Sequence, residues 1–139
     1  PRERLFDAIM RRFEHFETRR AGVLSMMKER DRSPQGLVRL GRARRKSADW
    51  ALTAARLDVG SPIRLGTQRL GLMRTLSKTE KAWRTDEAGD YARTMATLDA
   101  ELLEMEERLN QFARFRDRFR PSGAASSPPE APQAETNEA

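Results

Sequence analysis

Apolar side chains recur along residues 1–117 at intervals of three and four positions, which is the spacing of one face of a helix. In the first segment Leu5, Ile9 and Phe13 lie four residues apart. Similar stripes follow over residues of about 19–30, 34–57, 62–84 and 90–117. No run of strand length alternates with period two, so the pattern predicts an all-α protein of about five helices. Short connections make consecutive helices antiparallel neighbours.

Serine followed by proline marks the start of two of these helices. In Ser33-Pro34 and Ser61-Pro62 the serine hydroxyl can accept an otherwise unpaired N–H of the first turn. Proline has no N–H to leave unpaired at that position. Residues 58–60 are predicted to end the third helix, and residues 85–89 to separate the fourth from the fifth.

The end of the chain differs in composition from the rest. Residues 121–139 hold four of the seven prolines and no aromatic or branched aliphatic side chain. Such a segment cannot bury enough apolar surface to offset the entropy of ordering it. The sequence therefore predicts one helical domain over residues 1–120, followed by a disordered tail over residues 121–139.

The chain is basic, with 27 Lys and Arg against 21 Asp and Glu and a net charge of +6. Residues 1–60 carry most of the excess, and the densest basic run is Arg42, Arg44, Arg45 and Lys46. No recognisable DNA-binding module accompanies this run, and Trp50 is the only aromatic residue close to it. A solvated helix face, a contact with a phosphate or a partner, and direct nucleic-acid recognition all remain open for it.

The sequence offers little for catalysis or metal binding. It has no Cys, its only imidazole is His15, and no nucleophile stands beside a base in a known catalytic motif. An acidic run on the last predicted helix lacks the histidines of a di-metal site and is expected to be a solvated face with a Glu104–Arg108 pair. Its members are Glu101, Glu104, Glu106 and Glu107. No apolar run reaches the length of a membrane span. We expect no enzyme activity, no cofactor and no bound metal.

Methionine and aromatic side chains are the candidates for a ligand pocket. Six Met residues and the phenylalanines of the first helix can pack the core or line a cavity for an apolar ligand, since Met adapts to many shapes. Trp50 and Trp83 pose the same alternative, and each indole N–H needs a partner if it is buried.

Several short motifs follow one another in a definite order along the chain. They are Arg-Glu-Arg-Leu-Phe-Asp-Ala-Ile-Met-Arg-Arg-Phe at 2–13, Ala-Asp-Trp at 48–50, Ala-Ala at 54–55, the break at 58–60, Trp-Arg-Thr-Asp at 83–86, and Ala-Arg-Thr-Met-Ala-Thr-Leu-Asp at 92–99. Together they resemble the C-terminal domain of tetracycline-repressor-like (TetR) transcriptional regulators of bacteria. The similarity covers roughly residues 1–112.

The resemblance implies a cytoplasmic regulator in which this chain senses an unknown small-molecule effector and forms a homodimer through its last two long helices. A helix-turn-helix module before Pro1 is expected to bind operator DNA, and no membrane partner is implied. The implied effector pocket is lined by Phe13, Met27, Trp50, Met73 and Leu76. The implied dimer interface contains Leu70, Met95, Leu98, Leu102 and Leu109.

Two other hypotheses remain open. Residues 77–81 (Ser-Lys-Thr-Glu-Lys) depart from the TetR pattern, in which this part of the helix is often apolar and aromatic. A lipid-binding family of ubiquinone biosynthesis shares the fold and a similar spacing of Trp, Asp, Thr and Leu-Asp. This leaves a lipid- or isoprenoid-binding protein without a DNA role as the alternative. The third hypothesis is a basic adaptor that contacts nucleic acid through residues 42–46.

Overall fold

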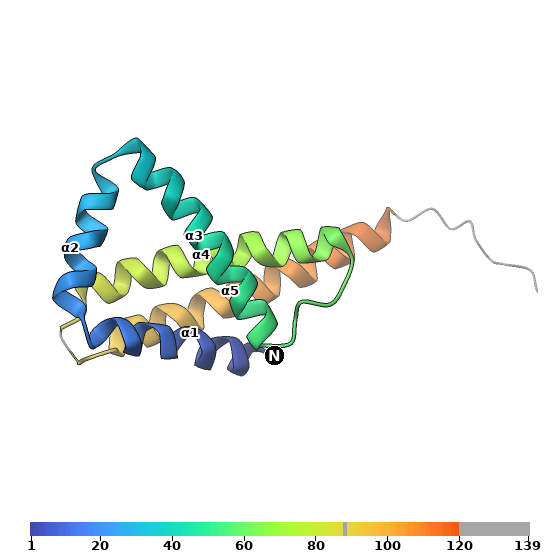
Figure 1. The fold of residues 1–139 in the computed structure, drawn as a ribbon. Coiled ribbons are helices and arrows are strands. Elements are labelled where there is room, and N and C mark those ends of the chain that lie inside the picture. Colours follow the sequence, from blue (N-terminus) through green and yellow to red (C-terminus); the bar gives the residue numbers. More distant parts are fainter. Residues whose placement is uncertain (88, 120–139) are drawn as a thin grey trace, which may run out of the picture.

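The structure is a computed structural model that describes residues 1–87 and 89–119. Within them lie five α-helices and no strand (Figure 1): α1 (Arg2–Glu17), α2 (Arg20–Asp31), α3 (Pro34–Ala54), α4 (Pro62–Thr85) and α5 (Ala92–Arg118). The predicted all-α class with about five helices is confirmed. The predicted tail over 121–139 lies outside the described residues. None of these helices is long and apolar enough to cross a membrane.

Both serine-proline pairs begin a helix, as predicted. Ser33 Oγ accepts a hydrogen bond from the N–H of Gly36 at 2.9 Å, and Ser61 Oγ accepts one from the N–H of Arg64 at 3.3 Å. The proline that follows each serine lies in the first turn of its helix. An N–H at that position would have no partner within the helix, so proline, which has no N–H, loses no hydrogen bond there. These caps fix where α3 and α4 begin.

Helix α3 ends at Ala54, earlier than the Leu57 predicted from the apolar pattern. Arg56 adopts the left-handed conformation with φ of 57°. The N–H of Leu57 then donates to the carbonyl of Leu52 at 2.8 Å, which closes the helix with a Schellman turn. Glycine is the usual residue at such a helix end, and this sequence has Arg56 instead. The apolar pattern therefore predicted a helix that continues beyond its true end.

Helices α4 and α5 form a long antiparallel pair, and α1 runs along α5 (Figure 1). Helix α2 turns away from α1, and α3 returns across α4 to pack on α1 as well. The close approach of α4 and α5 depends on Gly71. A Cβ built on Gly71 would lie 2.7 Å from Cγ of Met105, so with a larger residue either the Met105 side chain or the two helices would have to shift.

The core lies where α1, α3, α4 and α5 meet. Its largest fully buried side chains include Phe13, Ile9, Leu72, Trp83, Leu98 and Leu102. Trp83 donates its indole N–H to Glu17 at 3.0 Å, and Arg20 covers its ring at 4.6 Å, so the expected N–H partner is present. Leu37, Ile63 and Leu70 belong to the apolar stripes of α3 and α4 but lie outside this core, since they are 54%, 62% and 67% exposed.

The turn between α4 and α5 is held by side chains of the motifs at 83–86 and 92–99. Asp86 accepts hydrogen bonds from the backbone N–H of Thr94 at 2.8 Å and from its hydroxyl at 2.6 Å. Arg20 donates to the carbonyls of Trp83 and Asp86 at 2.9 and 2.5 Å. These motif residues therefore have a structural role in joining α2 to the α4–α5 turn.

Candidate functional site

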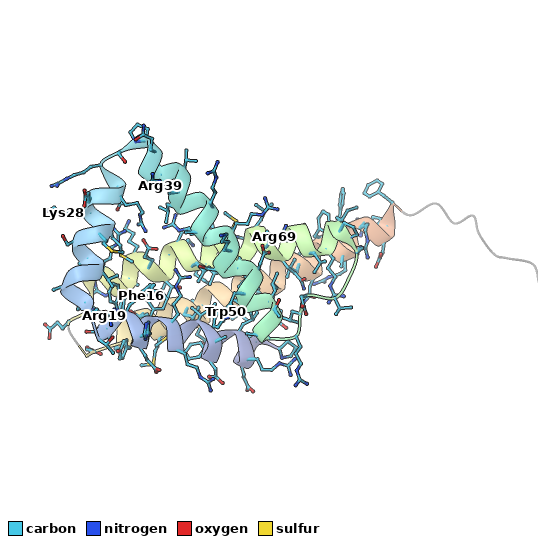
Figure 2. All side chains as sticks on the ribbon, in the orientation of Figure 1. Phe16, Arg19, Lys28, Arg39, Trp50 and Arg69 are labelled. Atoms are coloured by element: carbon cyan, nitrogen blue, oxygen red, sulfur yellow. The ribbon has the colours of Figure 1, made fainter. Side chains whose placement is uncertain are left out.

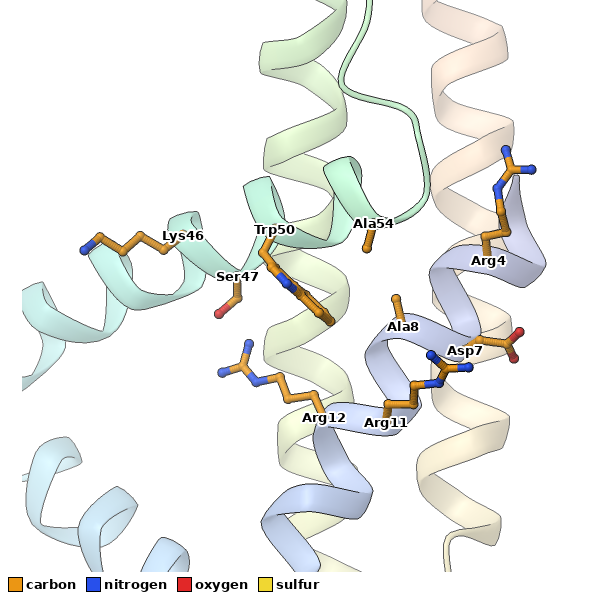
Figure 3. A pocket seen from close by; sticks show the side chains of 9 residues that line it. All are labelled: Arg4, Asp7, Ala8, Arg11, Arg12, Lys46, Ser47, Trp50 and Ala54. Carbon is orange, nitrogen blue, oxygen red and sulfur yellow. The ribbon is translucent and has the colours of Figure 1, made fainter.

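A groove of about 680 Å³ opens between α1 and α3 (Figure 3). We call it the α1–α3 groove. Its lining comes from two helix faces and combines basic side chains with one large aromatic ring: Arg4, Asp7, Ala8, Arg11 and Arg12 from α1, and Lys46, Ser47, Trp50 and Ala54 from α3. Its volume falls in the range of small-molecule sites, which is about 300–1,000 Å³.

Helical periodicity brings these residues to the groove. On α3, Lys46, Trp50 and Ala54 are four residues apart and therefore share one face. Trp50 is 54% exposed and extends from α3 into the space above α1 (Figures 2 and 3). The small side chains of Ala8 and Ala54 leave room beside its ring. The groove therefore has an open aromatic wall.

The basic side chains of the groove lack carboxylate partners. Arg4, Arg11, Arg12 and Lys46 make no ion pair within the described part of the chain, although Asp7 lies in the same lining. Arg4 donates instead to the carbonyl of Ala55 at 3.0 Å. Among the described residues, the groove consequently carries an excess of positive charge.

Arg12 is the innermost of these cations. Its guanidinium lies over the ring of Phe16 at 5.0 Å. Burial lowers the pKa of Arg12, the attraction of Glu80 opposes this change, and the repulsion of Arg44 adds to it. The inner end of the α1–α3 groove therefore places Arg12 near both a carboxylate and a second guanidinium group.

Behind Arg12 lies the Glu80 cluster, which comprises Arg30, Asp31, Arg44, Glu80 and Arg84. The Glu80 carboxylate accepts from Arg30 at 2.9 Å and from Arg84 at 2.8 Å, and Arg44 lies 3.5 Å from it. Asp31 bridges Arg30 and Arg84 at 3.0 and 2.7 Å, and hydrogen bonding from Arg84 is the main cause that lowers the pKa of Asp31. Three guanidinium groups thus share two carboxylates, and the Nε of Arg44 is buried without a partner in the described chain.

The five predicted pocket residues do not gather around this groove. Trp50 lines it, whereas Phe13, Met27 and Leu76 are only 2%, 6% and 5% exposed within the core. Met73 is partly buried and packs against the same core. Four of the five predicted pocket residues therefore contribute to core packing. Trp50 is the one predicted pocket residue that lines the groove.

The basic run of α3 divides into two directions. Arg42 and Arg45 are exposed to solvent, and Lys46 lines the α1–α3 groove. Arg44 points inward to Glu80. Sequence reasoning missed the cations on α1. The signal available was the placing of Arg4 and Arg11 seven residues apart, which puts them on one face of the first helix.

The predicted dimer interface needs correction at two positions. Leu98 and Leu102 are 0% and 1% exposed, because this part of the α5 stripe packs into the chain's own core. Met95 is 42% exposed but lines a groove beside α1. Leu70 is exposed, and with the partly buried Leu109 it lines a different groove of about 360 Å³ between α4 and α5.

The acidic run of α5 is also only partly as predicted. Glu104 pairs with Arg108, which confirms that pair. Glu101, by contrast, is 9% exposed and binds Lys78 of α4, so it is not part of a solvated face. His15 is exposed on α1. Among the described residues no three His, Asp or Glu side chains gather closely enough to hold a metal ion.

Comparison of the chain with protein-family models, with curated proteins and with solved structures finds no match.

Proposed function

We propose that this chain is the effector-sensing and dimerisation domain of a TetR-like transcriptional regulator. The proposal combines the ordered motifs in the sequence with the helix arrangement, in which the last two helices are the longest, at 24 and 27 residues. The observation that carries it is an exposed apolar patch on that helix pair. We call this patch the α4–α5 face and define it by Leu70, Leu109 and Phe112, which line one groove.

A second copy of the chain is the occupant that suits the α4–α5 face. Leu70 and Phe112 are 67% and 43% exposed, so the α4–α5 face presents apolar side chains to solvent. Helix α4 carries six basic residues and one acidic residue, whereas residues 99–107 of α5 hold five carboxylates and no basic residue. Under a twofold axis that sets each α4 against the partner's α5, basic residues of α4 would come near the acidic residues 99–107, while Arg74, Glu101 and Arg108 line the groove itself.

The α1–α3 groove supplies a place for the effector in this proposal. The groove lies between α3 and α1, whereas the proposed dimer interface lies on α4 and α5. Helix α3 connects the two regions, because it packs on both α1 and α4. A ligand between α1 and α3 would favour one arrangement of these helices over another. In the proposed regulator α1 would follow the DNA-binding module, so such a change would alter the spacing of these modules in a dimer.

Sedimentation velocity tests the dimer. We expect the full chain to be dimeric at micromolar concentration and Leu70→Glu to be monomeric, because the new carboxylate would be buried against apolar surface. Leu37→Glu is the matched control, since Leu37 is 54% exposed on α3 and outside the α4–α5 face. A monomeric wild-type chain, or equal dissociation in both variants, would refute the proposed interface. The coding sequence upstream of Pro1 tests the regulator itself, which requires a helix-turn-helix there.

A groove with several leucine side chains supports a second candidate, a lipid- or isoprenoid-binding protein of the same fold. This groove of about 420 Å³ is lined by Leu5, Leu57, Leu102 and Leu109, together with polar residues such as Arg64, Glu106 and Arg116. Native mass spectrometry of protein purified from cells separates the two candidates. A co-purified lipid would support the second, and a clean mass of the chain alone would count against it.

A further inference from the structure

We propose that the α1–α3 groove binds a small aromatic carboxylate, with its anionic group at the end of the groove that Arg12 and Lys46 line and its ring against Trp50. This inference rests on the proposed function in one respect, since it names the chemical class of the effector. The binding itself depends only on the groove. It is based on one concave site that holds both an exposed indole ring and cations that make no ion pair within the described residues (Figure 3).

The charge of the groove selects an anion. Four cations and one carboxylate line it, and none of the four makes an ion pair in the described chain. Arg12 is partly buried beside the Glu80 cluster, where three guanidinium groups already share two carboxylates. A carboxylate next to Arg12 would give this guanidinium the ion-pair partner that it lacks among the described residues, and it can form the paired hydrogen bonds that guanidinium groups favour.

Trp50 selects a flat ring. Trp50 is 54% exposed, so part of its ring is open to a ligand. Ala8 and Ala54 flank it and are too small to cover it (Figure 3). A ring of similar size, stacked on the indole face, would bury this surface while its carboxylate reaches toward the cations.

A small molecule fits these features better than a nucleic acid does. Binding a single strand uses several aromatic side chains spaced along a basic track, and this groove contains one. Arg42 and Arg45 of α3 lie outside the groove, and they add no second aromatic ring on which a base could stack. The groove is therefore suited to one ring and one charge.

Nuclear magnetic resonance of the two indole N–H groups tests the proposal directly on the full chain. Titration with 1-naphthoate should shift the signal of Trp50 saturably. The signal of Trp83 should stay in place, because its N–H is buried and bonded to Glu17. The neutral 1-naphthamide should bind at least about tenfold more weakly, since it offers the same ring without the charge-assisted hydrogen bonds. Trp50→Phe assigns the two signals.

Matched charge variants locate the anion. Lys46→Gln should weaken 1-naphthoate binding by about tenfold, the expected loss for one charge-assisted contact. Arg42→Gln and Arg45→Gln remove the same charge from exposed positions of α3 outside the groove and should leave the dissociation constant within about twofold. All three positions are exposed, so each variant should fold.

Four results would overturn the inference. Naphthoate and naphthamide could bind equally well, Lys46→Gln and Arg42→Gln could weaken binding equally, or both indole signals could move equally. The fourth such result is that a ten-nucleotide oligothymidylate displaces naphthoate at a lower concentration than benzoate does. Failure of this inference is distinguishable from failure of the proposed function. A dimeric chain that does not bind 1-naphthoate refutes only the effector class. A monomeric chain that binds it refutes only the dimerisation domain.

Discussion

Glu80 is the residue on which the packing of three helices converges. Its carboxylate is 6% exposed and is shared by Arg30 of α2, Arg44 of α3 and Arg84 of α4. A buried carboxylate is costly to desolvate, and here that cost is offset by several charged hydrogen bonds. Removing the negative charge would leave the three arginines to repel one another with only Asp31 nearby.

We therefore expect Glu80→Gln to lower the free energy of unfolding by about 3 kcal/mol, as is typical when one partner of a buried ion pair is lost. Urea denaturation followed by circular dichroism measures this change. Glu107→Gln is the matched control, because Glu107 is exposed on α5 and should change stability by less than about 0.5 kcal/mol. Equal stability of the two variants would show that the Glu80 cluster contributes nothing to holding α2, α3 and α4 together.

At the scale of the element, the two mid-helix glycines of α4 face different surroundings. A Cβ on Gly66 would meet no atom within 4 Å, whereas a Cβ on Gly71 would lie 2.7 Å from Cγ of Met105 on α5. Alanine favours a helix over glycine by about 1 kcal/mol at either position. At Gly71 the gain is opposed by overpacking between α4 and α5, which typically costs about 1–3 kcal/mol.

The expected outcome is that Gly66→Ala stabilises the chain by about 0.5–1 kcal/mol and that Gly71→Ala is less stable than Gly66→Ala by about 1–3 kcal/mol. Thermal and urea denaturation of the two variants, each compared with the wild type, give the difference. If both variants are stabilised to the same extent, α4 and α5 do not approach as closely at Gly71 as the structure has them.

The elements show why some features could be predicted and others could not. Helix starts depend on local residues, and the two serine-proline pairs were sufficient to predict where α3 and α4 begin. The end of α3 was missed because Arg56 takes a conformation that its sequence does not announce. On α4 the apolar residues permit two helix faces, and only packing against α5 decides that Leu72 is buried and Leu70 exposed.

The candidate site was predictable to a similar degree. Trp50 and Lys46 were both identified from the sequence, as a pocket residue and as a contact for a phosphate or partner. Their common groove was not predictable, because Arg12 joins it from α1 through a tertiary contact between helices far apart along the chain. Local pattern reveals which side chains share a helix face, and only the packed structure reveals which faces meet.

At the scale of the whole molecule, charge is distributed unevenly along the pair of helices that we propose as the dimer interface. Helix α4 is strongly basic and residues 99–107 of α5 are acidic. Part of this charge is already paired within the chain, as in the contact of Lys78 with Glu101. Exposed carboxylates such as Glu107 are left for a second copy.

Opposite charges across the interface predict a dimer that weakens with salt. Raising the sodium chloride concentration from about 0.05 M to about 0.5 M shortens the screening length to a few ångströms, so long-range attraction between α4 and the partner's α5 is lost. We expect the dissociation constant, measured by sedimentation equilibrium, to rise by about tenfold while a dimer persists through the apolar contact of Leu70 and Phe112. Leu37→Glu, remote from the face, should show the same salt dependence as the wild type. A dissociation constant that falls with salt would mean that like charges meet across the interface, and it would contradict the proposed pairing of α4 with the acidic residues 99–107 of the partner's α5.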